Sequence, residues 1–176
     1  MRVKRFNKRT GVTIAEVIVA TMITVLVIGA GYAFYVMAKD VWLHVFVQTE
    51  MQNDAMLATE KMIYGLEVDA LGSRKGIQES QDVLVPPSGG SGPQIEFVDP
   101  DDTSVTRLFF QSGDTIVYTD GNDVNTVILD QGVQSLLFTR PVDHDDLVLI
   151  GLVLERTVRG RAIRVELNTS TRLRNI

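Results

Sequence analysis

The sequence predicts an α+β protein in which a long N-terminal hydrophobic helix packs against a C-terminal antiparallel β-sheet. Three observations predict this fold. Residues 17–38 carry no charge, residues 39–71 keep a helical spacing of apolar side chains, and the chain beyond Pro93 alternates strand-like runs with turn residues. At 176 residues the chain is long enough for one domain and an anchor.

The uncharged run is long enough to cross a membrane. As a helix, residues 17–38 would extend over ~33 Å, which exceeds the thickness of the hydrocarbon core. An ordinary secretory signal has an apolar core of only about 7–15 residues, followed by a small-residue cleavage site. No such site follows here. We therefore expect the segment to be retained in the membrane.

Charge is distributed unevenly along the chain. Five cations and no acid precede Gly11, and the remainder has 12 basic and 22 acidic residues. Because positively charged flanks stay on the cytoplasmic side, this asymmetry places the N-terminus inside and the acidic body outside. The chain has no cysteine, which excludes disulfides and thiolate metal sites.

The helical pattern continues beyond the uncharged run. Apolar residues recur at three- and four-residue spacing, and no proline occurs before Pro86. Gly72 is the stop signal that the sequence offers. The pattern predicts one helix over residues 12–71, with an apolar stripe formed by Met51, Ala55, Ala58, Met62 and Leu66. The alternative is two helices that are separated near Lys39 and Asp40.

Strand signals fill the C-terminal part of the chain. A loop rich in glycine and proline ends at residues 86–93, and turn residues separate the runs that follow. Hairpins of a meandering antiparallel sheet have this pattern. The predicted strands are residues 95–98, 106–111, 115–119, 125–129, 133–139, 147–157 and 162–171.

Glu16 lies at the start of the apolar helix, where a charge is unexpected. A charged side chain at the centre of a membrane helix costs roughly 2.5–3.5 kcal/mol even on insertion scales. Gly11 stands five residues before it, directly after the basic head. The basic leader, Gly11, Glu16 and the apolar run together resemble the N-terminus of type IV pilin-like proteins, which carry a class III (prepilin) signal peptide.

The resemblance implies a processing site and a domain plan. Residues 1–11 would be the leader, cut by a prepilin peptidase between Gly11 and Val12, and Val12 would become the N-methylated terminus. Glu16 would be the fifth mature residue and would align subunits by meeting a terminal amine. Residues 12–38 would form the transmembrane and filament-core helix, residues 39–72 its outer half, and residues 73–176 a β-rich globular domain.

The rest of the chain resembles a smaller group within this family. Residues 58–72 (ATEKMIYGLEVDALG) and the closing TSTRLRN are similar to J-like minor pseudopilins and W-like minor pilins. Val12 and Ala15 depart from the usual phenylalanine and bulkier aliphatic residue, and the cysteine pair of many major pilins is missing. This departure argues against an abundant adhesive pilin.

The expected function is assembly without catalysis. The resemblance implies a single-pass protein of the bacterial inner membrane, with a cytoplasmic N-terminus and a periplasmic or extracellular domain. It would help to initiate or cap a type II secretion pseudopilus or a type IV pilus, together with other pilin-like subunits and an inner-membrane assembly platform. The alternatives are a signal-anchored exported binding domain that never assembles, and a competence-pilus minor pilin that contacts DNA.

Other chemistry has little support in the sequence. The chain has two histidines, and no serine stands in a GxSxG-like turn, so we expect no enzyme. Acidic loops could offer oxygen ligands to calcium, with Asp120, Asn122 and Asp123 as candidates. None has the EF-hand pattern, and hairpin turns favour the same residue types. We expect turns and no cofactor.

Arginines gather in the last predicted strands. They are Arg156, Arg159, Arg161, Arg164, Arg172 and Arg174, whereas residues 76–146 hold 13 acids and two arginines. Such asymmetry can orient a subunit toward an oppositely charged neighbour. Arginine clusters also neutralise phosphate, but acidic residues alternate with these cations. We therefore expect a solvated strand face or a subunit interface in preference to a nucleic-acid site.

Overall fold

The computed structural model describes residues 11–68, 72–73, 76–99, 102–120 and 125–174. The described chain is α+β, as the sequence predicts, with a helix α1 (Ile14–Tyr64) and a short 3-10 helix η1 (Ile77–Glu79). Its contacts divide into two units, Met1–Leu43 and His44–Ile176. The strands are β1 (Glu67–Val68), β2 (Gly72–Ser73), β3 (Val83–Val85), β4 (Ser91–Gly92), β5 (Gln94–Val98), β6 (Thr106–Ser112), β7 (Thr115–Thr119), β8 (Asn125–Leu129), β9 (Val133–Thr139), β10 (Leu147–Val158) and β11 (Arg161–Arg172).

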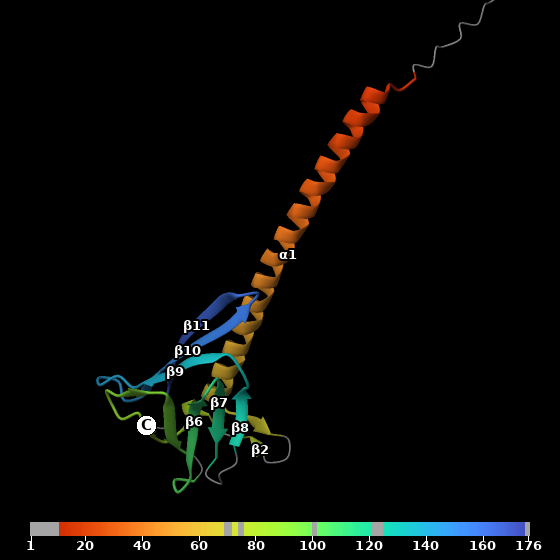
Figure 1. The fold of residues 1–176 in the computed structure, drawn as a ribbon. Coiled ribbons are helices and arrows are strands. Elements are labelled where there is room, and N and C mark those ends of the chain that lie inside the picture. Colours follow the sequence, from red (N-terminus) through yellow and green to blue (C-terminus); the bar gives the residue numbers. More distant parts are fainter. Residues whose placement is uncertain (1–10, 69–71, 74–75, 100–101, 121–124, 175–176) are drawn as a thin grey trace, which may run out of the picture. The chain divides into compact units, whose positions relative to one another are not determined.

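The helix α1 is continuous over 51 residues (Figure 1), so the alternative of two helices separated near Lys39 and Asp40 is not what the structure shows. It is long and apolar enough to cross a membrane, judged by length and composition. None of the membrane-length apolar window is buried within the protein. The N-terminal unit therefore exposes an apolar helix surface, which is stable in a lipid bilayer or against other apolar helices but not in water.

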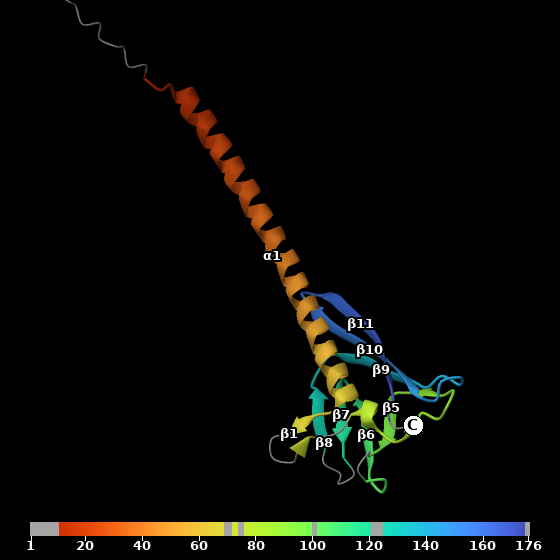
Figure 2. The ribbon, with the colours of Figure 1, turned by 180° about the vertical axis from the view of Figure 1, so that it is seen from behind.

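The C-terminal end of α1 lies earlier than Gly72, the stop that the sequence predicts. The helix ends at Tyr64, and Gly65 adopts a φ of 97° while its N–H bonds to the Lys61 carbonyl at 2.9 Å. Glycine after the last helical residue is a common cap because it takes positive φ without steric cost. The chain then forms the β1–β2 pair (Figure 2), where the sequence predicts that the helix continues to residue 71.

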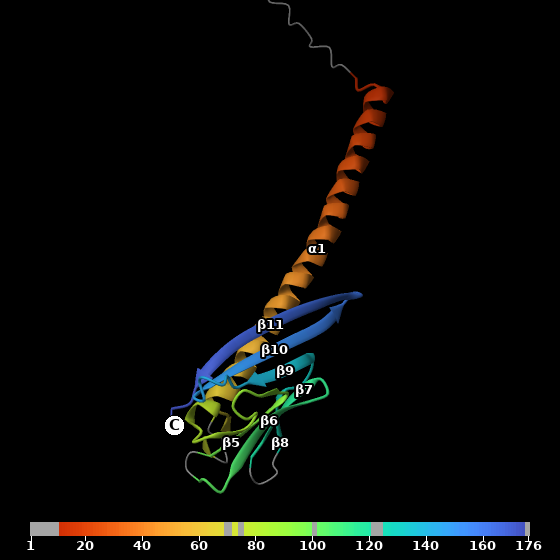
Figure 3. The same cartoon turned by 90° about the vertical axis from the view of Figure 1, so that its left-hand side faces the viewer.

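The seven strands that the sequence predicts are β5 to β11, and each lies within two residues of its expected bounds. They do not form one meander. The strand orders are β11-β10-β9-β4 and β3-β5-β6-β7-β8, so the chain changes sheet between β8 and β9. Figure 3 shows β11, β10 and β9 side by side. The β10–β11 hairpin closes through Arg159 and Gly160, both at positive φ, as a tight two-residue turn requires.

The core of the C-terminal unit forms between the predicted stripe of α1 and the inner faces of both sheets. Met51, Ala55, Ala58 and Met62 are fully buried. The two alanines allow the sheets to approach the helix, and aromatic side chains fill the remaining volume. Phe97 and Phe109 stack at 5.5 Å between ring centroids, and Tyr118 lies 4.8 Å from Phe109. The sequence prediction is confirmed for these four residues, whereas Leu66, the fifth residue of the predicted stripe, is buried but lies beyond the end of α1.

Candidate processing and assembly site

Gly11 and Val12 precede the first turn of α1 and are exposed. A Cβ atom added at Gly11 would meet no atom within 4 Å among the described residues. Val12 is 74% exposed. The peptide bond between Gly11 and Val12 is therefore accessible to a protease. No distant residue among those that the structure describes covers Gly11.

The first turn of α1 is closed by a reciprocal pair of side-chain contacts. Thr13 is the residue before the helix, and its Oγ1 accepts a hydrogen bond from the backbone N–H of Glu16 at 3.3 Å. In return, Oε2 of Glu16 accepts from the Thr13 backbone N–H at 2.8 Å and from the Thr13 hydroxyl at 3.0 Å. This geometry is a capping box, which satisfies N–H groups that have no partner within the helix.

The capping box gives the Glu16 carboxylate a partner within its own chain. A charged group is costly in lipid unless it is hydrogen-bonded or paired. Both contacts to Thr13 use the same oxygen, Oε2. The local fold thus holds the carboxylate at a defined position on the first turn and directs one of its oxygens to the backbone.

Gly11, Val12 and Glu16, the three site residues that the sequence predicts, lie within six consecutive residues at the start of α1. Sequence reasoning missed Thr13, the residue that orients Glu16. The signal was present, because Thr13-Ile14-Ala15-Glu16 fits the capping-box pattern of a hydroxyl residue followed three positions later by an acid.

The helical turns that follow Glu16 have an apolar surface, and their threonine hydroxyls are hydrogen-bonded within the helix. Thr21 donates its hydroxyl to the Val17 carbonyl at 2.6 Å, and Thr24 donates to the Ala20 carbonyl at 2.8 Å. Hydroxyls that bond to the preceding turn leave no donor pointing outward. This part of α1 is thereby compatible with lipid or with packing against other apolar helices.

The candidate calcium ligands are only partly covered by the structure. Asp120 follows β7, whereas Asn122 and Asp123 lie outside the described residues. Within the described ranges, no three acidic or histidine side chains converge as a metal site would require. Nearby, Thr119 donates its hydroxyl to Oδ1 of Asn125 at 2.6 Å, which joins the two strand ends.

Several of the clustered arginines contact carboxylates of the same chain. Arg156 reaches Asp54 at 3.0 Å and Glu50 at 3.5 Å, both on α1. The exposed Arg164 and Arg172 lie 3.9 Å from Glu166 and 3.7 Å from Asp146, respectively. Arg156 therefore fastens β10 to the helix, while the other two are part of a surface of mixed charge.

No family model, curated protein or solved structure matches the chain. Its function is therefore inferred from the fold and from the geometry of residues 11–16. These residues combine an accessible glycine, an oriented carboxylate and an apolar helix that continues into a β-rich unit.

Proposed function

We propose that this chain is the precursor of a minor pilin-like subunit that helps to initiate or cap a type II secretion pseudopilus or a type IV pilus. The observation that carries the proposal is the position of Glu16. Its carboxylate is held on the first turn of an exposed apolar helix, five residues after an accessible glycine.

The exposed Gly11–Val12 peptide bond is where a prepilin peptidase would act. Cleavage there removes all five cations of the N-terminal head and creates an amine on Val12. The mature chain would then begin two residues before α1, with methylated Val12 as its first residue. Loss of the cationic leader lowers the cost of drawing this end of the helix out of the membrane.

Glu16 would serve as the alignment residue. A terminal amine and a carboxylate in an apolar environment stabilise each other, and either one alone is costly. Thr13 holds Oε2, so the Glu16 carboxylate is already oriented when a neighbouring subunit presents its own Val12 amine. A subunit at the wrong depth would leave both charges without a partner, and this penalty would select the correct register.

The cellular arrangement follows from these roles. The precursor would be a single-pass protein of the bacterial inner membrane, with its basic N-terminus in the cytoplasm and its C-terminal unit in the periplasm. Its partners would be the prepilin peptidase, an inner-membrane assembly platform and other pilin-like subunits. In the filament, the first half of α1 would pack against the apolar helices of its neighbours.

Cross-linking mass spectrometry on native membranes tests the proposal. We expect an N-terminal peptide that begins at methylated Val12, and cross-links from α1 to other pilin-like helices. The partners captured would distinguish a secretion pseudopilus from a type IV or competence pilus. An intact leader without pilin-like neighbours would refute the proposal and favour a signal-anchored binding domain.

A further inference from the structure

The exposed aromatic side chains of the described residues all lie on α1, and most of them gather in one short segment. Residues 12–31 contain no aromatic side chain, whereas residues 32–46 contain several, each more than half exposed. They are Tyr32, Phe34, Tyr35, Trp42 and Phe46. Exposed aromatic surface is costly in water, so this segment is expected to contact something else.

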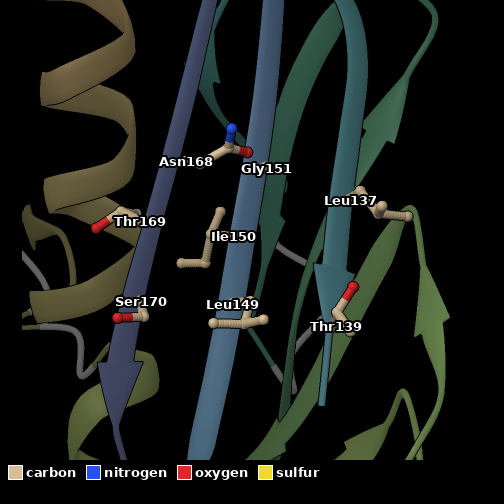
Figure 4. Close-up of a pocket in the computed structure, with 8 residues that line it drawn as sticks. All are labelled: Leu137, Thr139, Leu149, Ile150, Gly151, Asn168, Thr169 and Ser170. Atoms are coloured by element: carbon tan, nitrogen blue, oxygen red, sulfur yellow. The ribbon is translucent and has the colours of Figure 1, made fainter. Parts of the chain in front are cut away.

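In the sheets, by contrast, aromatic side chains fill the core. Those that are fully buried are Phe97, Phe109, Tyr118 and Phe138. The hollow lined by β9, β10 and β11 is no exception, because its walls are aliphatic or polar (Figure 4), with Leu137, Leu149 and Thr139 among them. Among the described residues, an exposed aromatic surface is therefore a feature of α1 alone.

Four residues of the aromatic segment lie on one face of α1. They are Tyr32, Tyr35, Lys39 and Trp42, which we call the boundary stripe. Their spacings of three, four and three residues place them within an arc of about 80° at 3.6 residues per turn. All four are exposed, and each combines an apolar ring or stem with a polar end.

The boundary stripe lies one membrane thickness from Glu16. Lys39 is the first charged residue after Glu16, and the rise between them is ~35 Å along the continuous helix. The rise from Glu16 to Trp42 is ~39 Å. The hydrocarbon core of a bilayer is about 30 Å thick, and about 40–45 Å with its headgroup regions. Glu16 and the stripe can therefore stand at the two boundaries of one bilayer at the same time.

We propose that the boundary stripe binds phospholipid headgroups at the outer surface of the membrane and so holds α1 at the depth where Glu16 lies at the inner surface. The inference rests on the proposed function only in taking α1 as a membrane anchor. Tyrosine and tryptophan favour the headgroup level, because their rings are apolar and their polar ends form hydrogen bonds.

Lys39 supplies the contact to lipid phosphate. Its ammonium is paired with no carboxylate of the described residues, and its long stem can lie along the apolar helix while its charge stays in the headgroup layer. Asp40 lies about 100° further round the helix, so its charge does not interrupt the stripe. Lipid is favoured over a neighbouring apolar helix as the partner, because helix packing over the stripe would bury Lys39.

The stripe and Glu16 would fix the depth of the helix together. Moving α1 by one turn, ~5.4 Å, in either direction would draw one of the two charged residues into the hydrocarbon. Glu16 would therefore keep access to water, together with its contact to Thr13, until assembly draws the helix outward. The stripe would thus hold the subunit in position before it enters a filament.

Fluorescence of Trp42 tests the inference, because this residue is the only tryptophan of the chain. The full-length protein is reconstituted at low density in vesicles of phosphatidylethanolamine and phosphatidylglycerol, whose acyl chains carry bromine at a shallow or a deep position. We expect the shallow bromine to quench Trp42 more strongly than the deep one, and iodide in the water to quench it weakly.

Paired variants test whether the stripe sets this depth. Tyr35→Ala combined with Lys39→Ala removes two anchors and keeps the probe, and the ratio of shallow to deep quenching should fall about twofold. Phe34→Ala combined with Val41→Ala is the matched control, because both residues are exposed but lie outside the arc, and the ratio should not change. Lys39→Arg keeps the cation and should keep the ratio. Circular dichroism shows that each variant is folded.

Several outcomes would overturn the inference. Strong quenching by iodide alone would place Trp42 in water, and dominant quenching by the deep bromine would place it in the hydrocarbon. Protection from all three quenchers would show that protein covers the stripe. An unchanged ratio in the Tyr35 and Lys39 variant would show that the stripe does not set the depth. Cleavage at Gly11 and incorporation into a filament are measured independently, so a failure here is distinct from a failure of the proposed function.

Discussion

Thr13 donates its backbone N–H to Oε2 of Glu16 at 2.8 Å, and Glu16 returns a backbone N–H to the Thr13 hydroxyl oxygen at 3.3 Å. This reciprocal contact connects the two roles of the N-terminal segment. It starts the helix next to the proposed cleavage position, and it orients the carboxylate that the proposed function uses for alignment. Both roles can be tested separately.

Substitution of Gly11 by leucine should block processing without changing the fold. No described atom lies within 4 Å of the added Cβ, so any effect arises where the peptidase binds. We expect the uncut precursor to accumulate in membranes, as measured by mass spectrometry of the N-terminal peptide. Normal cleavage of this variant would contradict the assignment of Gly11, and Gly29→Leu within α1 is a control that should be cut normally.

Substitution of Glu16 by alanine should leave cleavage intact and impair incorporation. The Val12 amine of a neighbour would then have no carboxylate, and a penalty of about 1.4 kcal/mol already lowers incorporation tenfold. Quantitative mass spectrometry of sheared filaments measures the ratio of filament-bound to membrane-bound subunit. An unchanged ratio would show that Glu16 is not needed for incorporation into the filament.

Thr13→Ala isolates the capping role from the charge. Loss of a threonine cap costs about 1 kcal/mol, so the first turn of α1 should fray. Hydrogen exchange of the Glu16 and Val17 amides in micelles should accelerate in Thr13→Ala and stay slow in Thr13→Ser, which keeps the hydroxyl. Equal protection in all three proteins would show that the capping box is not needed to start the helix.

Arg156→Met should destabilise the C-terminal unit, because this arginine connects β10 to α1. Its side chain is 22% exposed and contacts Asp54 at 3.0 Å. Removal would leave a partly buried carboxylate without its partner, at a cost of about 1–2 kcal/mol. Chemical denaturation measures the free energy of unfolding of the C-terminal unit. Arg164→Met is the matched control, since its side chain is 59% exposed and its loss should cost less than about 0.5 kcal/mol.

Asp102 should titrate below the ordinary range of an aspartate. The Ser104 hydroxyl and then its backbone N–H, which donate to Oδ1 at 2.6 and 2.9 Å, lower the pKa of this carboxyl. Because the pKa of Asp102 is lower in the folded protein than in the unfolded chain, the ionised carboxylate stabilises the fold at pH values above about 3.9, the ordinary pKa of an aspartate. This stabilisation is lost as the pH falls through the lowered pKa. An NMR titration should show the pKa rising toward its ordinary value in Ser104→Ala, but not in Thr103→Ala.

Much of the fold could be predicted because its signals are local. The apolar spacing of Met51, Ala55, Ala58 and Met62 identified the buried face of α1, and alternating side chains located β5 to β11. These patterns depend on the geometry of single elements, 3.6 residues per helical turn and two per strand repeat. The end of α1 was misplaced because Gly65 and Gly72 carry the same stop signal, and only the positive φ of Gly65 distinguishes them.

The candidate site was likewise predictable from the sequence only in part. The sequence by itself places Gly11, Val12 and Glu16, the residues of the proposed cleavage and alignment site, and it contains the capping pattern of Thr13 and Glu16, because both are patterns of consecutive residues. Only the tertiary structure decided that the strands form two larger sheets and that Arg156 faces α1. Each of these depends on which strands become neighbours. Pairing between distant segments is selected by packing of the whole core, which no local pattern encodes.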